Sequence, residues 1–186
     1  MTIADNPMLA SPDMAMKFAI LHAVDRPLDE LSVREICGKA GISRDTFYRH
    51  FNSKYGIPVW HGKLVQSLYL DQAGRTMDWE TGYCHDFRLL AEERNFYAFA
   101  FKHLGRFNDE FPEMNEHRKA VLLETLRDWH GVDVDDDLMF CLDAFVMLET
   151  VLVTRWLRAG CDAAPEAFAK RMMSVVPAAL LEAMTR

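Results

Sequence analysis

The side chains best suited to bind a ligand in this chain of 186 residues lie close together in the sequence, between Ser32 and Lys54. Most of them carry N–H or O–H groups that can donate hydrogen bonds to oxygen or nitrogen acceptors. The arginine guanidinium can also make paired hydrogen bonds with a phosphate or with the edge of a guanine base. The polar residues in question are Arg34, Arg44, Asp45, Thr46, Tyr48, Arg49, His50 and Lys54.

Two short helices are predicted to position these side chains. Ser32 and Glu35 have the spacing of a capping box, in which each side chain bonds a backbone N–H of the other residue. Gly41 is expected to end the first helix, because glycine readily adopts positive φ. Ser43 is expected to cap the second helix.

The second helix is predicted to have one buried and one exposed face. Phe47 and Phe51 lie four residues apart and should pack inward, whereas Arg44, Tyr48 and Arg49 share the opposite stripe. A capped helix pair with a glycine turn and an arginine- and tyrosine-bearing face is typical of a helix-turn-helix that contacts DNA. The alternative interpretation is an ordinary amphipathic helix with a solvated charged face.

At these residues the chain resembles the TetR family of bacterial transcription regulators. The matching pattern is SVREICGKAGISRDTFYRHFNSK, and the resemblance covers roughly residues 13–60. It implies an all-α dimer with an N-terminal three-helix helix-turn-helix domain and a C-terminal helical domain for ligand binding and dimerisation. We place these domains at residues 1–58 and 59–186. The resemblance further implies a ligand-responsive repressor that binds a palindromic double-stranded DNA operator.

The resemblance also suggests a role for each polar side chain. The second helix would enter the major groove, with Arg44 and Arg49 at guanine edges or phosphates. Lys54 would meet a phosphate near the start of a fourth helix, and Arg34 would make a second phosphate or minor-edge contact. Asp45 could accept from a cytosine amino group or repel the DNA backbone, and both roles remain open. Positions that touch phosphates or bases in the family are matched by Thr46, Tyr48 and His50.

The net charge of −7 argues at first against DNA binding, but its distribution weakens the objection. Residues 1–58 hold seven Lys/Arg and seven Asp/Glu and are therefore neutral. The whole excess of negative charge lies in residues 59–186, which hold fourteen Lys/Arg and twenty-one Asp/Glu. A DNA-binding protein requires a local basic face rather than a basic chain. Because this face is modest, we expect binding to be strongly sensitive to salt.

Neither a membrane segment nor a metal site is indicated. No apolar run reaches the roughly 18 residues of a membrane span, and the first residues lack the pattern of a signal peptide. The four cysteines are scattered without a CxxC pair, which favours structural thiols in a reducing compartment. We therefore expect a cytoplasmic protein with no membrane partner, metal or cofactor.

Two other functions compete with DNA-binding regulation. An enzyme is disfavoured, because the sequence holds no HExxH, GxSxG or phosphate-binding glycine loop. A TetR-like coactivator or protein-binding module that has lost DNA binding is the stronger alternative. The intact Thr46, Tyr48, His50 and Lys54 argue against it, whereas the neutral charge of residues 1–58 leaves it open.

The remaining chain has the pattern of successive helices. Ser11 followed by Pro12 is a start signal for the first helix. Ser53 is expected to cap a fourth helix that runs to about Asp71, and Pro58 should remove one backbone hydrogen bond from its opening turns. Further helices are predicted over residues 82–93, 94–105, 113–130, 135–159 and 165–185.

A second copy of the chain is the expected cover for the C-terminal helices. The segment Leu138–Trp156 is apolar nearly all round, so it needs cover on more than one side. The last helix, which Pro177 should kink, supplies another apolar face, and two helices from each subunit would form a homodimer interface. A monomeric core is the alternative. The apolar positions of the last helix are Phe168, Met172, Val175, Val176, Ala179 and Ala183.

Aromatic side chains crowd the middle of the chain, and a cavity between helices could bind a small-molecule effector there. Each aromatic residue is more often part of a core than of a cavity. Tyr97 and Phe101 are four apart, and His103 could add a polar contact. Glu149 could bind a polar or cationic group or simply reach the solvent edge. The candidate ligand-binding residues are Phe87, Tyr97, Phe101, His103, Trp129, Phe145 and Glu149.

Overall fold

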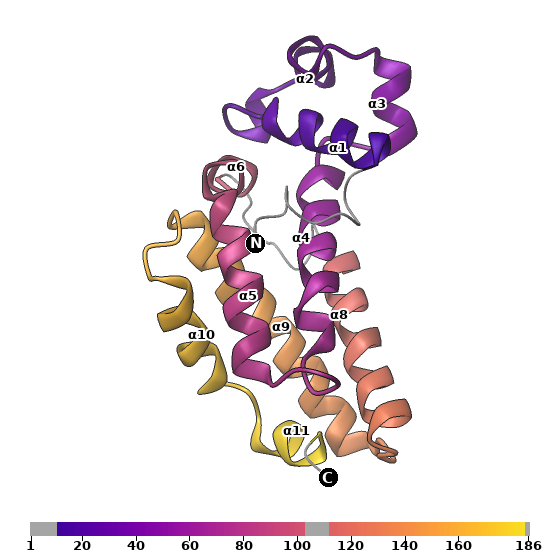
Figure 1. Cartoon of the computed structure of the whole chain (residues 1–186), viewed down its shortest axis with the longest axis vertical. Helices are drawn as coiled ribbons and strands as arrows, with labels where there is room; N and C mark the ends of the chain where they lie inside the picture. Colours follow the sequence, from indigo (N-terminus) through magenta and orange to yellow (C-terminus); the bar gives the residue numbers. More distant parts are fainter. Residues whose placement is uncertain (1–10, 103–111, 185–186) are drawn as a thin grey trace.

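The computed structural model describes residues 11–102 and 112–184, and in these ranges the chain is all-α without a β-strand. Figure 1 shows three short helices at one end of an elongated molecule, a bundle at the other end, and α4 running between them. The helices are α1 (Pro12–His22), α2 (Val33–Ala40), α3 (Arg44–His50), α4 (Gly56–Leu68), α5 (Trp79–Glu92), α6 (Arg94–Ala100), α8 (Pro112–Glu124), α9 (Asp136–Arg158), α10 (Pro165–Met173) and α11 (Ala178–Ala183). None of these described helices is long and apolar enough to span a bilayer.

The N-terminal helices begin and end as their capping residues predict. Ser11 caps α1, and the predicted capping box of Ser32 and Glu35 is present at the start of α2. Gly41 ends α2 with a φ of 68°, in the left-handed region. The Ser43 hydroxyl then accepts a hydrogen bond from the backbone of α3 at 3.0 Å. The local geometry of the helix-turn-helix therefore follows from the sequence.

A small apolar core holds this end together. Phe47 is fully buried and Phe51 nearly so, as predicted, with their ring centroids 5.8 Å apart. Trp60 of α4 continues the aromatic cluster, at 5.8 Å from Phe51 and 5.3 Å from Phe18 of α1. The first turns of α4 are thereby packed against the helix-turn-helix.

Helix α4 begins later than expected. Ser53 does not cap it, because the first helical residue is Gly56 and the preceding Tyr55 makes no capping hydrogen bond with its side chain. Pro58 is then the third helical residue, where a backbone N–H has no partner within the helix, so the expected loss of a bond does not arise. The domain boundary that we predict after residue 58 falls inside this first turn.

The last predicted helix is two helices. Pro177 separates α10 from α11 instead of kinking one continuous helix. Helix α10 lies along α5 (Figure 1), and its Phe168 and Met172 are buried within the same subunit. The Phe168 ring stacks on Trp156 of α9 with centroids 4.7 Å apart. The apolar positions assigned to a dimer interface in this segment therefore serve mainly the core of the subunit.

Short 3-10 and π-helical segments adjust the chain between the long helices. The 3-10 helices η3 (Leu28–Glu30) and η4 (Leu70–Gln72) precede α2 and α5, and the π-helical η5 (Thr125–Trp129) extends α8. The predicted helix over 113–130 is thus α8 followed by η5. Of the predicted helix over 94–105, α6 covers residues 94–100 and residues 103–105 lie outside the described ranges.

A buried ion pair joins three helices of the bundle. Arg118 of α8 donates from Nε to Oε2 of Glu149 on α9 at 2.9 Å, and Tyr83 of α5 donates its hydroxyl to Oε1 of the same carboxylate. All three residues are at most 3% exposed. Burial disfavours the charged guanidinium, but the adjacent Glu149 carboxylate outweighs it and raises the pKa of Arg118. The Arg118 guanidinium therefore stays charged inside the bundle.

We predict that Arg118→Met lowers the free energy of unfolding by about 3–5 kcal/mol, because it leaves the Glu149 carboxylate buried without a cation. Urea denaturation of the purified protein measures the change. The matched control is Lys119→Met, whose partially exposed ammonium pairs with Asp143 at 2.6 Å and should contribute less than about 1 kcal/mol. A loss in Arg118→Met as small as that of the control would contradict the prediction.

Candidate DNA-binding face and effector cavity

Helix α3 presents its predicted polar stripe to solvent. Arg44, Asp45, Tyr48 and Arg49 are all exposed, and 47% of the Tyr48 surface is accessible. The Arg44 guanidinium carbon lies 5.9 Å from the centroid of the Tyr48 ring. The Tyr48 ring in turn packs edge-on against the buried Phe47 ring, with centroids 5.5 Å apart. The phenol is therefore supported from below while its outer edge is free to contact a ligand.

Hydrogen bonds within α3 organise the same face. The Thr46 hydroxyl lies 2.9 Å from the Ser43 hydroxyl and accepts a hydrogen bond from Arg49 Nη2 at 3.2 Å. Thr46 is half-buried by these contacts. The arrangement draws the Arg49 guanidinium toward the N-terminal end of α3, close to the side that also carries Arg44.

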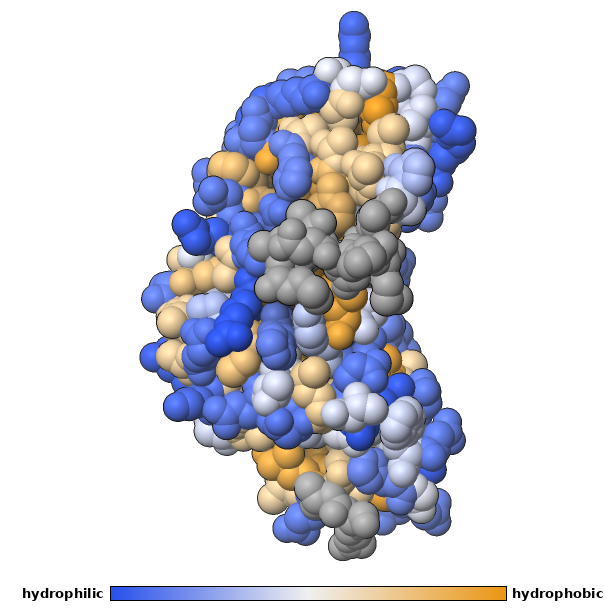
Figure 2. Space-filling view, in the orientation of Figure 1, coloured by the Kyte–Doolittle hydropathy of each residue, from blue (hydrophilic) through white to orange (hydrophobic). Residues whose placement is uncertain are grey.

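The positive charge of this end is concentrated on three arginines. Among the described residues, Arg34, Arg44 and Arg49 have no carboxylate within salt-bridge distance. Three other cations of the domain are in ion pairs, Lys17 with Asp13, Arg26 with Glu35, and Lys39 with Asp25, and Lys54 is held by backbone carbonyls. In Figure 2 hydrophilic residues lie along the rim of the outer end of the molecule, where α2 and α3 are found. A neutral domain thus still presents a local basic face.

Two of the residues predicted to contact DNA make contacts within the protein instead. The Lys54 ammonium donates to the backbone carbonyls of Leu28 and Leu31, the latter at 2.8 Å, and so anchors η3. The His50 ring, whose side chain is 16% exposed, places Nδ1 3.0 Å from a carboxylate oxygen of Asp13 on α1. Both residues therefore stabilise the helix-turn-helix. One of the three N–H donors of Lys54 remains for a phosphate, and that contact stays a prediction.

A cavity lies inside the bundle, between α4, α5, α6, α8 and α9. Its volume is about 50 Å³, enough for a few water molecules. Three predicted ligand residues, Tyr97, Phe101 and Glu149, line it. The other lining residues are Pro58, Val59, Gly62, Gln66, Leu70, Asp86, Leu90, Met114, Thr150, Val153, Thr154 and Leu157.

Comparison with known proteins agrees with the geometry of the N-terminal end. Residues 23–57 match the sequence model of the bacterial regulatory proteins of the tetR family. The N-terminal domain of this chain is a TetR-family helix-turn-helix domain. No curated protein matches the chain in sequence.

Solved structures extend the likeness to the whole fold. The dihydroxyacetone kinase operon activator DhaS is similar over 91% of this chain and 96% of its own, with 18% identity and a TM-score of 0.58. A complex of RolR with resorcinol matches over 93% of each chain, with 17% identity and a TM-score of 0.46. At this identity the DhaS likeness shows the fold: a TetR-type helix-turn-helix followed by a helical C-terminal region.

Three of the predicted ligand residues do not line the cavity. Phe87 is fully buried among Tyr83, Trp156 and Phe168, so it belongs to the core between α5, α9 and α10. Phe145 is also buried, and its ring packs 6.0 Å from that of Trp79. Trp129 lies in η5 with 52% of its surface exposed. The remaining predicted ligand residue, His103, lies outside the described residues.

The most informative cavity residue is one that the sequence analysis missed. Asp86 is 1% exposed, and its Oδ1 has no hydrogen-bond partner among the described residues. Burial raises the pKa of this carboxyl well above its usual value, against the effect of Arg118 nearby. A signal was present in the sequence: Asp86 continues the i, i+3, i+4 spacing of Trp79, Tyr83 and Leu90, which is the buried face of α5.

A histidine connects the cavity to the TetR-type domain. His61 of α4 is fully buried, and its Nδ1 lies 2.6 Å from the hydroxyl of the cavity residue Tyr97. On its other side the ring meets Phe18 of α1 edge-on, with centroids 5.9 Å apart. Burial, assisted by His22, lowers the pKa of His61 to about 3. The imidazole is therefore neutral at physiological pH and acts as a packed hydrogen-bonding link.

We predict that His61 makes the fold sensitive to acid. A histidine with a lowered pKa contributes stability that is present above its unfolded value near 6.5 and is lost as pH falls toward 3, because only the unfolded chain gains the proton. The advantage in unfolding free energy of the wild type over His61→Asn should shrink by about 2 kcal/mol from pH 7 to pH 5. Denaturation curves at both pH values measure this change.

The control is His85→Asn, which removes a half-buried imidazole stacked on Tyr69 in the same bundle. Measured over the same interval, this variant gives the pH dependence that follows from losing a different imidazole of the bundle. A wild-type advantage over His61→Asn that is constant between pH 5 and pH 7 would show that the imidazole does not resist protonation.

Proposed function

We propose that the protein is a ligand-responsive, sequence-specific transcription regulator that binds a palindromic DNA operator as a homodimer. The observation that carries this proposal is the face of α3: two arginines with no acidic partner among the described residues flank an exposed tyrosine on a TetR-type recognition helix. The helix is short and capped, and it stands at the outer end of the molecule (Figure 1). This position allows it to enter a major groove.

The polar residues divide into base and phosphate contacts. Arg44 is exposed beside the Tyr48 ring, and we assign it to a guanine edge, where a guanidinium makes two hydrogen bonds. Arg49, drawn back by Thr46, is assigned to a phosphate, as is Arg34 on α2. Asp45, exposed on the same stripe, would reject some bases or accept from a cytosine amino group.

We predict that Arg44→Ala weakens binding to the preferred operator by about tenfold to a hundredfold and reduces discrimination against a mismatched site. The operator is first selected from a random duplex pool with the wild-type protein, and fluorescence anisotropy then gives both affinities. Lys17→Ala is the matched control, because it removes a cation of α1 that is already paired with Asp13 at 2.9 Å.

Three outcomes separate the possible roles. Equal losses on matched and mismatched sites would move Arg44 from the bases to the phosphates. Equal effects of the two substitutions would contradict the assignment of the α3 face. A wild-type protein that enriches no duplex would favour a coactivator that works through a protein partner, and the name of DhaS as an operon activator makes that outcome worth testing.

The homodimer is proposed to form through the exposed face of α9. A stripe of apolar side chains runs along this helix on the side opposite Glu149, with Phe140 76% exposed and Met147 52% exposed. Exposed apolar stripes of this kind mark contact surfaces. The stripe consists of Phe140, Ala144, Met147, Leu148 and Val151.

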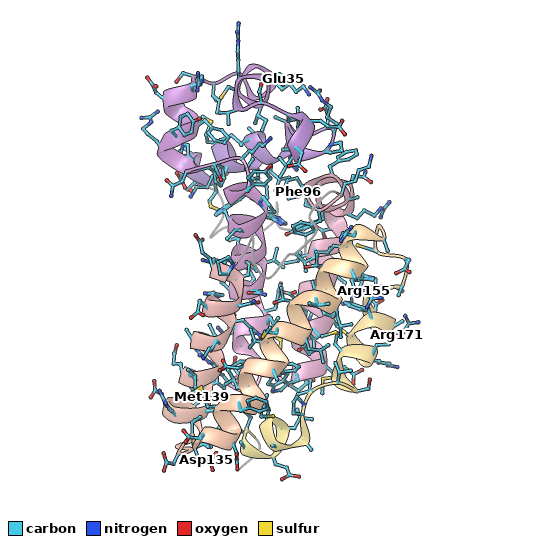
Figure 3. The ribbon with its side chains drawn as sticks, turned by 180° about the vertical axis from the view of Figure 1, so that it is seen from behind. Glu35, Phe96, Asp135, Met139, Arg155 and Arg171 are labelled. Atoms are coloured by element: carbon cyan, nitrogen blue, oxygen red, sulfur yellow. The ribbon has the colours of Figure 1, made fainter. Side chains whose placement is uncertain are left out.

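Charge favours a second copy as the occupant of this stripe. Helix α9 begins with the acidic run 135–137 and ends with Arg155 and Arg158, and Figure 3 shows Asp135 and Arg155 at opposite ends of the helix. In a two-fold dimer with antiparallel α9 helices, the acidic end of each would face the basic end of the other. Met147 and Leu148 would then meet their counterparts near the axis.

Dimerisation would set the spacing between the two recognition helices. Two α3 helices about 34 Å apart would match successive major grooves on one side of the duplex. An effector in the cavity could change this spacing through α4, whose His61 contacts both Tyr97 and Phe18. A difference in ligand affinity worth about 1–3 kcal/mol between the two states is sufficient for a useful switch.

We predict that Ala144→Glu raises the dissociation constant of the dimer by at least about a hundredfold, because two charges would be buried near the two-fold axis. Light scattering coupled to size-exclusion chromatography measures the mass at several concentrations. Ala120→Glu, the same substitution at an exposed alanine of α8, is the control and should leave the dimer intact. If Ala144→Glu remained fully dimeric at low concentration, the α9 interface would be wrong.

A further inference from the structure

Two carboxyl groups, those of Asp86 and Glu149, line the cavity, and only one of them is in an ion pair with a described residue. Glu149 is satisfied by Arg118 and Tyr83, and Asp71 lies beside the His117 ring, with Oδ2 3.1 Å from Nε2. Asp86 has no ion-pair partner among the described side chains, although it is almost fully buried. A buried carboxyl without a counter-charge is unfavourable in the empty cavity, and a bound cation would relieve this.

A second acceptor faces the same space. Oε1 of Gln66, on α4, is buried and has no hydrogen-bond partner in the described part of the chain, and Gln66 lines the cavity together with Asp86. Two unpartnered acceptors fit a ligand group with several donors. An ammonium group has three N–H donors and no acceptor, whereas a hydroxyl has a single donor.

The remaining wall defines the rest of the ligand. Leu90, Phe101, Met114, Val153 and Leu157 line the same cavity and provide most of its apolar surface. The methionine is the most adaptable of these, because its unbranched thioether side chain fits objects of different shape. A compact apolar body with one polar end would match this lining.

We propose that the cavity binds a small organic cation, a protonated amine on a compact apolar body, with the Asp86 carboxylate as its counter-ion and Gln66 as a second acceptor. The inference rests on the proposed function in so far as the amine would be the effector of the regulator. It concerns this cavity alone and does not depend on which operator is bound.

Isothermal titration of the full-length protein tests the proposal with two matched series. n-Butylamine and benzylamine carry the cation, n-butanol and benzyl alcohol are their neutral counterparts, and benzoate carries the opposite charge. We expect at least one amine to bind at least tenfold more tightly than its alcohol, and benzoate to show no binding. Alcohols that bind as tightly as the amines, or the failure of both amines to bind, would overturn the proposal.

Three variants test whether the amine binds at Asp86 and Gln66. Asp86→Asn keeps the shape of the side chain and removes its charge, so it should weaken amine binding at least tenfold and leave the alcohols unchanged. Gln66→Leu should weaken the amines to a lesser degree. Asp143→Asn removes a half-buried carboxylate that pairs with Lys119 on the outside of the bundle, and it should have no effect. Equal amine affinity in Asp86→Asn and wild type would contradict the assignment.

The operator complex separates this inference from the proposed function. Amine binding through Asp86 that leaves operator affinity unchanged would support the site and contradict an effector role. Loss of operator affinity on addition of the amine, absent in Asp86→Asn, would support both. A protein that binds the selected operator but neither amine would overturn the inference and leave the DNA-binding proposal in place.

Discussion

The buried ion pair between Arg118 and Glu149 is the constraint on which the C-terminal bundle depends. Two charges removed from water must remain together, and here they come from α8 and α9, while Tyr83 adds a hydrogen bond from α5. This requirement sets the rotation of α9: Glu149 faces inward, so Leu148 and the rest of the apolar stripe face outward. Because Glu149 is already satisfied, Asp86 is left as the acceptor for a ligand.

Helix α4 connects that bundle to the TetR-type domain. Its first turns pack on the helix-turn-helix through Trp60, and its middle lines the cavity at Gly62 and Gln66. A Cβ at Gly62 would lie only 2.9 Å from Met114 Cε, so the end of this α8 side chain packs against α4 in the space that the glycine leaves. The neutral His61 joins the same stretch to Tyr97. An outward movement of α8 or α6 would therefore act on α4 directly.

The sequence predicted the helix-turn-helix in detail because its signals act over a few residues. The cap at Ser32, the left-handed Gly41 and the inward Phe47 depend on local spacing, and the structure contains all three. The ligand-binding aromatics were less predictable, since a ring at helical spacing is buried equally well in a core or beside a cavity. Phe87 lies in the core between α5, α9 and α10, a contact between segments about 80 residues apart. The partners of Lys54 likewise come from a distant turn.

The size of the cavity implies that an effector of the proposed kind would have to change the shape of the protein. Small-molecule pockets usually measure about 300–1,000 Å³, whereas the space around Asp86 is about 50 Å³. A ligand of several heavy atoms can therefore bind only if neighbouring helices separate or side chains such as Met114 move aside. Since α4 forms one wall and continues into the helix-turn-helix, widening the cavity and moving the recognition helix are linked by one rigid element. In the proposed regulator, effector binding and a change in operator affinity would then have the same physical origin.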